Sequence, residues 1–548
     1  MFRLDSRLDF HFDTSIKKMA GYKSMHQMHA CYIYTLSTAA RENMGPPTER
    51  ASLLPRRYVV ALLSFFGFAN IYAMRVNLSV AIVVMRNNRT VIAPNGTQIV
   101  ILLAMRLTIA RLLYHVRIFD NKSSLFQGPE FNWSSGVDGV ILGSFFYGYI
   151  LTQIIGGYLA CKHGGKRLFG LGVGVTAVVT LLTPLLARTS IYLLVFGRIV
   201  EGLFEGVTFP AMHGIWSKWS PPEERSRLVS ISYSGCYFGT VAALPLCGAL
   251  AERLGWASIF YVFGMFGCIW TAIWMYVVAD SPSDDAKISH QEKEYIEDSL
   301  GPANRVKLNV PWKAMFKSLP VWAIIVAHFS ENWGFYTLLT ELPTYLDDVF
   351  GYDFLRAGLL AALPYLAMAV IVQTSGFLAD WFRTSHLTTM QVRKLFTCLG
   401  FLTRATFLVA AANASTPTAI VTCLTVAVGF GGLSYAGFSV NHLDIAPQYA
   451  SILMGISNTF ATFPGILSPM VTGLIVTTGS KDEWQTILYI AAAVYVFGAT
   501  AYALLGSGKI QAWAMVAQEQ VFLSDNDQSQ TSTEDLIPVP TPRYQSTQ

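Results

Sequence analysis

Apolar runs of about twenty residues recur along this chain, separated by short polar turns. Each run is long enough to cross the roughly 30 Å of hydrocarbon in a bilayer as a helix, since a helix rises about 1.5 Å per residue. Only 13% of the 548 residues are charged, about half of the ~25% that a soluble protein carries. The sequence therefore predicts an all-α membrane protein that crosses the lipid bilayer many times.

Twelve spans are expected, in two sets of six. They lie near Tyr58–Met85, Val137–Ala160, Leu168–Ala187, Ile191–His213, Val229–Leu250, Ser258–Ala279, Val321–Leu346, Ala357–Leu378, Leu395–Ala412, Pro417–Phe438, Ser451–Val476 and Thr486–Leu505. The expected domains are an N-terminal tail (1–56), a six-helix bundle (57–279), a polar linker (280–317), a second six-helix bundle (318–506) and a disordered polar tail (507–548).

The two sets of spans look like a duplication. The stretch Gly157-Tyr-Leu-Ala-Cys161 follows the second span, and Gly376-Phe-Leu-Ala-Asp380 follows the eighth. Pro222 precedes the fifth span and Pro447 the eleventh, at nearly the same offset. Transporters built from such repeats place their substrate near the middle of the bilayer, between the repeats. We therefore expect two pseudo-symmetric bundles around a central site.

Lys and Arg gather in alternate loops and in the linker 280–317, which predicts that both termini are cytoplasmic. The long loop 86–136 then faces the lumen or the outside. It holds four N-glycosylation sequons, at Asn88, Asn95, Asn121 and Asn132. Within the same loop, Ile99–Ile118 is apolar but carries three arginines, and we interpret it as an interfacial amphipathic helix or an insertion.

Three ionisable residues, Arg198, Glu201 and Glu205, lie inside the apolar fourth span. Their spacings of three, four and seven place them on one face of a helix. A charge at the centre of a membrane helix costs about 2.5–3.5 kcal/mol on insertion scales, so this face is expected to look into the protein or a watery cavity. It indicates a substrate or proton path. The alternative is a buried ion pair that only fixes packing, but one Arg leaves one Glu without an obvious partner.

Arg75 lies deep in the first span, with Asn77 close by. A guanidinium there is suited to bidentate binding of a carboxylate or phosphate; the alternative is an Arg that extends its head to the interface. In the seventh span, His328 and Glu331 are three residues apart, and either is a candidate proton carrier. His213 is a gate, a relay or a structural hydrogen-bonding residue.

Two further features concern packing. Ser220 and Glu223 fit a capping box at the start of the fifth span, and Arg225 and Arg227 beside them are candidates for a latch between the bundles. Arg404 is charged with no partner in its own span, so we expect it to pair with a carboxylate on another helix.

Several functions are excluded by what the chain lacks. The seven cysteines form no CxxC pair and have no histidine at metal spacing, so neither a disulfide framework nor a metal site is expected. The net charge of +5 is scattered and carries no nucleic-acid signal. Neither a nucleophile elbow nor a phosphate-binding loop appears, so we expect no enzyme and no cofactor.

The chain resembles the anion:cation symporter branch of the major facilitator superfamily, from about Arg57 to Gly508. The motifs that carry the resemblance are Arg75-Val-Asn-Leu-Ser-Val-Ala, Ser144-Phe-Phe-Tyr-Gly-Tyr, Glu201-Gly-Leu-Phe-Glu-Gly-Val-Thr-Phe-Pro-Ala-Met-His213 and Asn441-His-Leu-Asp-Ile-Ala-Pro447. Within the branch it is most similar to the sialin-like members. The resemblance implies proton-coupled export of acidic sugars, or transport of acidic amino acids, in a lysosomal or vesicular membrane. The alternative is a sodium-driven phosphate cotransporter of the plasma membrane.

The resemblance also assigns residues. The substrate anion would contact Arg75, Asn77, Tyr147 and Arg198, and proton coupling would use Arg198, Glu201, Glu205, His213 and Glu331. Glu49, Leu53 and Leu54 fit an acidic dileucine sorting signal in the N-terminal tail, a site for adaptor proteins.

Two departures from the family pattern matter. Glutamate-selective members have an Arg where this chain has Glu331, which argues against glutamate specificity. Many members have an Asp where Cys161 stands, so the gate in that loop is expected to differ.

Overall fold

The computed structural model describes residues 54–85, 90–92, 98–100, 130–131, 133, 135–301, 310–350 and 354–515. From Pro55 onward the chain forms one compact unit. Of the expected tails 1–56 and 507–548, residues 1–53 and 516–548 lie outside the described residues, as does most of the loop 86–136.

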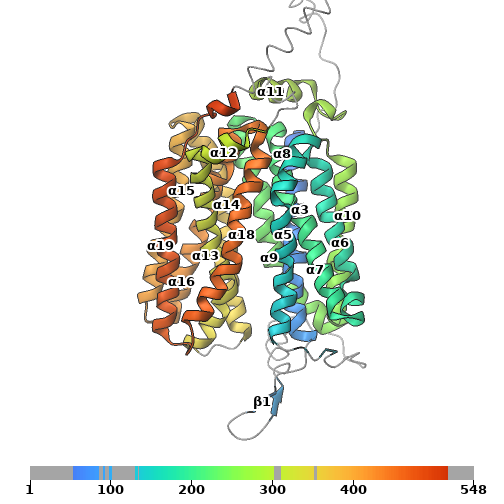
Figure 1. Ribbon diagram of the computed structural model, residues 1–548, viewed down its shortest axis with the longest axis vertical. Coiled ribbons are helices and arrows are strands. Elements are labelled where there is room, and N and C mark those ends of the chain that lie inside the picture. Colours follow the sequence, from blue (N-terminus) through green and yellow to red (C-terminus); the bar gives the residue numbers. More distant parts are fainter. Residues whose placement is uncertain are drawn as a thin grey trace, which may run out of the picture. The chain divides into compact units, whose positions relative to one another are not determined.

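Two helical halves are joined by a linker (Figure 1). The N-terminal half consists of α3 (Arg56–Met85), α5 (Ser135–His163), α6 (Gly165–Thr189), α7 (Ile191–Glu205), α8 (Thr208–Trp219), η1 (Pro222–Glu224), α9 (Arg225–Leu254) and α10 (Trp256–Val277). The linker holds η2 (Pro282–Asp284), α11 (His290–Leu300) and α12 (Trp312–Lys317). The C-terminal half consists of α13 (Leu319–Phe350), α14 (Phe354–Ser385), α15 (Thr389–Asn413), α16 (Pro417–Phe430), the π-helical turn η4 (Tyr435–Ser439), α17 (Val440–Ile445), η5 (Pro447–Tyr449), α18 (Ala450–Ile475) and α19 (Lys481–Leu505).

Ten helices in the described part of the chain are long and apolar enough to cross a membrane. The other two expected spans correspond to α7 with α8, and to α13. The former is interrupted at Gly206–Val207, which leaves helices of 15 and 12 residues. The latter carries His328, Glu331 and Asn332 in its middle, which lowers its hydropathy. Each expected span thus has a helical counterpart.

The packing repeats the duplication seen in the sequence. In the N-terminal half the closest helix pairs are α3 with α9, α5 with α7, and α6 with α10. The equivalent pairs in the C-terminal half are α13 with α18, α14 with α16, and α15 with α19. Each half also buries its own apolar core. Two six-span bundles are therefore present, as the repeated glycine motif predicts.

The halves meet at two crossings, α5 with α18 and α9 with α14. Gly157 lies at the first crossing, where an added Cβ would collide with the backbone of Ser451. Gly376 lies at the second, where an added Cβ would meet the Ser226 carbonyl and the Ser230 side chain. The two repeated glycines thus have the same role, because each lets helices of opposite halves approach closely.

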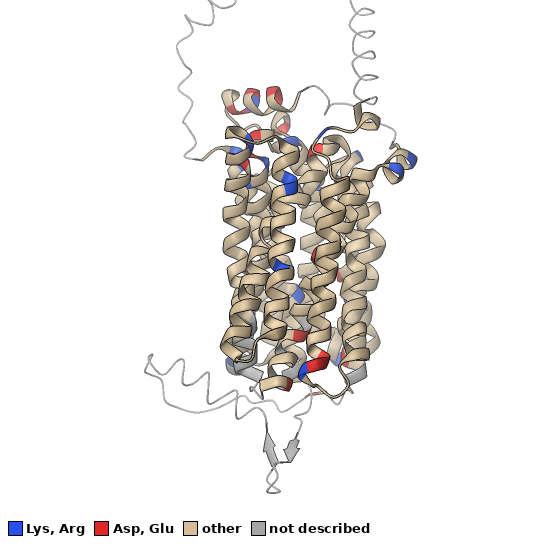
Figure 2. Cartoon of the chain, turned by 90° about the vertical axis from the view of Figure 1, so that its left-hand side faces the viewer, with Lys and Arg blue, Asp and Glu red and all other residues tan. Residues whose placement is uncertain are grey.

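The linker helices and the β-hairpin lie at opposite ends of the helical unit (Figure 1). We call the end that carries α11 and α12 the linker side, and the end that carries β1 (Thr90–Ile92) and β2 (Gln98–Val100) the hairpin side (Figure 1). Charged residues gather toward the two ends of the helices, and a few lie at mid-height (Figure 2). Under the predicted topology the linker side is cytoplasmic.

The linker is tied to the start of α3 by ion pairs. The Arg56 Nη2 atom lies 2.8 Å from Asp285 Oδ2, and Arg57 Nη1 lies 2.9 Å from Glu292 Oε1. Ser289 caps α11 by accepting a hydrogen bond from the backbone N–H of Glu292. The first half of the linker is thus anchored to the N-terminal half.

One local expectation was wrong, and another is tested only at its first residues. The capping box at Ser220 does not form, because the Ser220 hydroxyl donates back to the Trp216 carbonyl and η1 intervenes before α9. The start of the expected amphipathic helix, Ile99, is paired with Val91 in an antiparallel hairpin. The rest of that segment, 101–118, lies outside the described residues.

Candidate substrate and coupling site

The charged face of α7 is buried, as its spacing predicts. The helix starts at the Ser190 N-cap, whose side chain accepts from the Tyr192 N–H. Arg198, Glu201 and Glu205 are each no more than 5% exposed. α7 packs tightly on α5, where a Cβ at Gly202 would collide with the Phe145 carbonyl. This close approach is what presents the three side chains to the interior of the N-terminal half.

Both glutamates on this face are paired. Arg198 Nη1 lies 2.5 Å from Glu201 Oε2, and Thr180 donates to the other oxygen of Glu201 at 3.2 Å. Glu205 pairs with Arg75 of α3, whose Nε donates to Oε1 at 2.7 Å and whose Nη2 contacts the same oxygen. Glu205 is therefore the glutamate without a partner on its own helix, and its partner Arg75 lies on another helix.

Aromatic rings surround these cations. The Arg75 guanidinium lies 4.7 Å from the Tyr72 ring centroid, 4.9 Å from Phe145 and 5.0 Å from Tyr149. Phe145 also contacts the guanidinium of Arg198, at 5.2 Å. Aromatic faces attract cations and exclude water, so the two arginines share an apolar wall that leaves their N–H groups directed at carboxylates.

The site lies where the two halves meet. Asn458 of α18 donates to Gln153 at 2.9 Å and to the Tyr149 hydroxyl at 3.1 Å, both on α5. On the neighbouring helix turn, Phe146 stacks edge-on against Tyr336 of α13, with centroids 6.0 Å apart. Tyr149 thus contacts both Arg75 and Asn458 of the opposite half.

A charged latch closes the linker side. Asp444 of α17 accepts from Arg225 of α9 at 3.1 Å and from Arg393 of α15 at 2.6 Å. Arg393 also donates to Ser226 of α9 at 2.7 Å, and Arg225 donates to the Leu443 carbonyl at 3.1 Å, so several bonds of the latch join the halves. Arg225 thus takes part in the latch that its position in the sequence indicated.

The second carboxylate of the latch is Asp380 of α14. It accepts the backbone N–H groups of Ser226 and Arg227 at 3.0 and 2.8 Å, at the start of α9, where unpaired N–H groups favour an anion. At the equivalent crossing Cys161 makes only a thiol contact with the Gln448 carbonyl, at 3.3 Å. The departure at Cys161 thus places a thiol where Asp380 stands in the second repeat.

A third arginine–glutamate pair lies inside the C-terminal half. Arg404 Nη1 of α15 is 2.7 Å from Glu331 Oε1 of α13. Ser434 donates to the other oxygen of Glu331 at 2.9 Å, and Arg404 donates to the Tyr495 hydroxyl at 2.6 Å. The prediction that Arg404 pairs with a carboxylate on another helix is confirmed.

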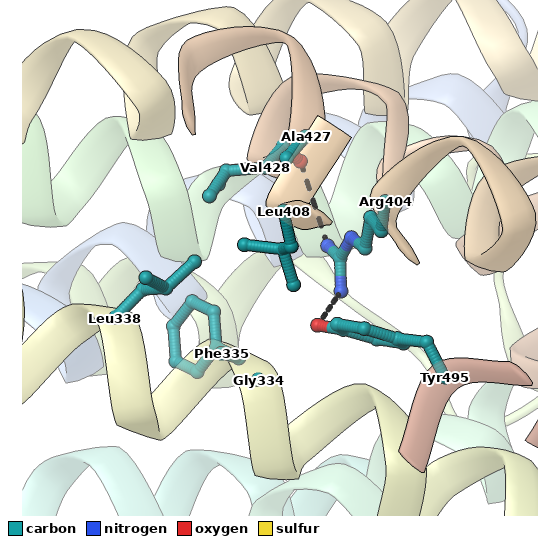
Figure 3. A pocket seen from close by; sticks show the side chains of 8 residues that line it. All are labelled: Gly334, Phe335, Leu338, Arg404, Leu408, Ala427, Val428 and Tyr495. Carbon is teal, nitrogen blue, oxygen red and sulfur yellow. Dashed lines mark hydrogen bonds between the residues drawn. The ribbon is translucent and has the colours of Figure 1, made fainter. Parts of the chain in front are cut away.

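Beside this pair is a small cavity of about 10 Å³ (Figure 3), lined by Gly334, Phe335, Leu338, Arg404, Leu408, Ala427, Val428 and Tyr495. It is large enough for about one water molecule. A larger cavity, of about 380 Å³, is an apolar groove along α3, α9 and α10, and Arg75 is not among its lining residues.

Other expected substrate residues are placed differently. Tyr147 is 60% exposed and shares its face of α5 with the exposed Leu151 and Ile155, so it is Tyr149, not Tyr147, that reaches Arg75. Asn77 is buried, and its Nδ2 has no hydrogen-bond partner among the described residues. Tyr147 and Tyr149 belong to the same motif, and the spacing along one helix does not determine which of the two tyrosines faces Arg75.

Several expectations fall on residues outside the described part. These are the sequons at Asn88, Asn95, Asn121 and Asn132, and the sorting-signal residues Glu49 and Leu53. Leu54, the last residue of that signal, is described and 47% exposed. The six cysteines that the structure describes are free.

Two pseudo-symmetric helical bundles that enclose buried ionisable residues at their interface are typical of a membrane transporter. The model of the Major Facilitator Superfamily matches residues 60–469, so the chain belongs to this superfamily of transporters. It is 44% identical to human sialin over 491 residues, which is 87% of this chain and 97% of sialin. It is 42% identical to the vesicular glutamate transporter 2 of Bos taurus, over 84% of this chain and 76% of that protein.

Solved structures support the fold. The proton:xylose symporter XylE superposes with a TM-score of 0.59 at 15% identity, over 83% of this chain and 97% of XylE. The fucose:proton symporter FucP of E. coli superposes with a TM-score of 0.53 at 13% identity, over 81% of this chain and 98% of FucP. The expected major facilitator fold is confirmed.

Proposed function

We propose that this protein is a proton-coupled transporter of organic anions, in which a substrate carboxylate and Glu205 compete for Arg75. The observation that carries the proposal is the Arg75–Glu205 ion pair at the interface of the two halves. Arg75 is the cation expected to bind substrate, and Glu205 holds it in the absence of one.

The competition follows from the geometry of a guanidinium. Nε and Nη2 form the edge of Arg75 that suits bidentate recognition of a carboxylate, and both contact Glu205 Oε1. When Glu205 takes up a proton it loses its charge, and this edge becomes available to the substrate. Binding of the proton and of the anion are then linked, so each raises the affinity of the site for the other.

Charge balance makes the linkage obligatory. An Arg75 without an anionic partner is a desolvated buried cation, which is costly. The halves can therefore rock when Arg75 faces either ionised Glu205 or a substrate with a proton on Glu205. Arg198 on the same face stays paired with Glu201, and its guanidinium adds positive charge near the bound anion.

The rings around Arg75 indicate the substrate class. Tyr72 and Tyr149 offer flat faces and hydroxyl groups, which suit a sugar ring that carries a carboxylate. Arg404 is paired with Glu331, so it is not free to bind a second carboxylate of the substrate. We therefore favour sialic acid or a related acidic sugar over acidic amino acids, in a lysosomal or vesicular membrane, where proton exit drives export.

The test is uptake by purified protein in liposomes with an imposed pH gradient and a panel of sialic acid, glucuronate, glutamate and phosphate. The wild type is expected to accumulate the acidic sugars. Glu205→Gln is expected to lose about tenfold or more of the pH-driven accumulation, equivalent to at least about 1.4 kcal/mol of coupling, and to keep exchange at equal pH because its Arg75 is always free. Normal pH-driven uptake by Glu205→Gln would refute the proposal.

Two controls sharpen the test. Glu130→Gln alters a carboxylate at the hairpin side that pairs with Arg188, away from Arg75, and is expected to leave pH-driven uptake unchanged. Replacing external sodium with choline separates the alternative, a sodium-driven phosphate cotransporter. Proton coupling predicts little effect of choline, whereas loss of uptake would favour that alternative.

A further inference from the structure

Three buried histidines meet between the halves, on the linker side of the coupling pair. His213 belongs to α8, and its ring centroid lies 5.0 Å from that of His442 on α17. His442 lies 6.5 Å from His328 on α13. All three side chains are buried. One histidine thus belongs to the N-terminal half and two to the C-terminal half.

The hydrogen bonds define the proton positions. His213 Nε2 and His442 Nδ1 both contact the Ser439 carbonyl, at 3.1 and 2.8 Å, and a carbonyl only accepts, so both nitrogens carry a proton. The shorter contact of His213 Nδ1 is with the Tyr233 hydroxyl, from which it accepts at 2.6 Å; the Phe209 carbonyl is farther away, at 3.4 Å. Each of these two rings has one donor and one acceptor nitrogen, which is the neutral form.

Ser457 completes the chain of bonds. Its hydroxyl donates to His442 Nε2 at 2.8 Å and accepts from His328 Nδ1 at 3.1 Å. The shared acceptor, Ser439, ends the π-helical turn η4, a distortion that is frequent at functional sites. The bond between His213 and the Ser439 carbonyl therefore joins α8 to the opposite half, and the Ser457 hydroxyl links the two histidines of that half.

The charged groups around the cluster are already paired. From α9, the group that faces His213 is Tyr233. One turn beyond His328 on α13 is Glu331, which is held by Arg404. Two residues beyond His442 is Asp444, which is held by Arg225 and Arg393. Among the described residues, none of these carboxylates is left over to stabilise a charged imidazole.

We propose that His213, His442 and His328 form a second protonation site, and that its protonation opens the linker side of the carrier. Positive charge on rings of opposite halves, 5.0 Å apart, repels across the surface that must separate. His213 lies eight residues after Glu205 along α7 and α8, toward the linker side, so the cluster is placed to receive a proton after the coupling pair releases it. The proposal rests on the proton coupling proposed above.

Opening of the linker side can be measured with the variant Ser451→Cys. Ser451 is buried at the α5–α18 crossing, where its hydroxyl donates to the Gly157 carbonyl at 2.9 Å. In Ser451→Cys, alkylation by a charged maleimide should require separation of the halves. The alkylation rate of free N-acetylcysteine at each pH corrects for the pH dependence of the reagent. Peptide mass spectrometry of the full-length protein in nanodiscs, without substrate, measures alkylation at position 451.

The corrected alkylation at position 451 is expected to rise about fivefold or more between pH 7.5 and pH 5.5, a typical size for coupling between two sites. Adding His213→Gln or His442→Asn is expected to remove the rise, because each amide keeps the donor to Ser439 but does not take up a proton at these pH values. A purely structural role predicts greater alkylation at both pH values with the rise retained, and that result overturns the proposal.

Glu205→Gln is the matched comparison. If it removes the rise while the histidine variants keep it, the pH response belongs to the carboxylate and the proposal fails. Because no substrate is present, failure of the histidine cluster is distinguishable from failure of proton-coupled uptake. Should the cysteine variant not fold, hydrogen–deuterium exchange of residues 450–458 in the unmodified chain gives the same readout, expressed as protection relative to the intrinsic base-catalysed rate at each pH. Protection there that does not change with pH also overturns the proposal.

Discussion

Two of the buried arginine–glutamate pairs, one from each half of the transporter, have different surroundings. Arg75 and Glu205 lie at the interface of the halves, where Tyr149 links them to Asn458 of the opposite half. Arg404 and Glu331 lie within the C-terminal half, and serine and tyrosine hydroxyls occupy their remaining bonding positions. The same chemistry therefore serves two purposes: a pair that can be opened by rocking is suited to coupling, whereas an enclosed pair is suited to holding helices together.

This comparison separates two groups that the sequence placed together. Glu331 was expected to share in proton coupling with Glu205. Its engagement by Arg404, and the cavity of only about 10 Å³ beside that arginine (Figure 3), favour a structural role. Whether a buried carboxylate exchanges protons depends on access to water as much as on burial.

The largest effect is expected from breaking the enclosed pair. Arg404→Met leaves Glu331 as an uncompensated buried charge, which costs about 3–5 kcal/mol, so the unfolding temperature of the purified protein should fall sharply. Arg75→Met should cost less, because Arg198 remains on the same helix face as Glu205 and the interface admits water when the halves part. Thermal unfolding in nanodiscs measures both.

The double variant Arg404→Met with Glu331→Leu is the control, since replacing a buried ion pair by apolar residues is often neutral. It should recover most of the stability and keep pH-driven uptake. Loss of that uptake in the folded double variant would show that Glu331 couples protons after all, and the distinction between the two pairs would disappear.

A smaller effect is expected at the two crossings. Asp380→Asn weakens charge-assisted bonds to two backbone N–H groups, which are worth about 1.5–3 kcal/mol each. The linker side should open more often, so alkylation of a cysteine at position 451 should rise about tenfold at pH 7.5.

Cys161→Ala removes only a weak thiol contact at the equivalent crossing. Here the alkylation is expected to change by less than about twofold, well below 1 kcal/mol. Equal effects of the two variants would mean that the charged latch at α9 and α14 adds nothing to the closed state.

The smallest effect is expected at the hairpin side of the N-terminal half. Hydrogen bonds from Arg188, and then from Trp256, hold the pKa of Glu130 below its usual range. A lowered pKa means that Glu130 stabilises the fold at pH values above about 4.3, the ordinary value, and that this contribution is lost as the pH falls through the lowered pKa.

Stability should therefore be insensitive to this group from neutral pH down to the acidity of a lysosome. Glu130→Gln should lower the free energy of unfolding by about 1 kcal/mol or less, since the group is partly exposed, and the difference from the wild type should vanish at strongly acidic pH. A difference that grows on acidification would contradict the assignment.

The sequence was informative wherever the property was local to one helix. Apolar length predicted the spans, the repeated glycine motif predicted the duplication, and helical spacing placed Arg198, Glu201 and Glu205 on one buried face. Errors arose where short-range bonding competed. Ser220 had two possible acceptors, and its hydroxyl took the preceding carbonyl instead of the expected cap.

By itself, then, the sequence determined the class of protein and the face of α7 that carries charge, because bilayer thickness and the helical period act on consecutive residues. Only the tertiary structure decided that Glu205 belongs to Arg75, that Glu331 belongs to Arg404, and that three histidines meet between the halves. Such partners depend on how helices from distant parts of the chain rotate and cross, and no spacing along one helix encodes that.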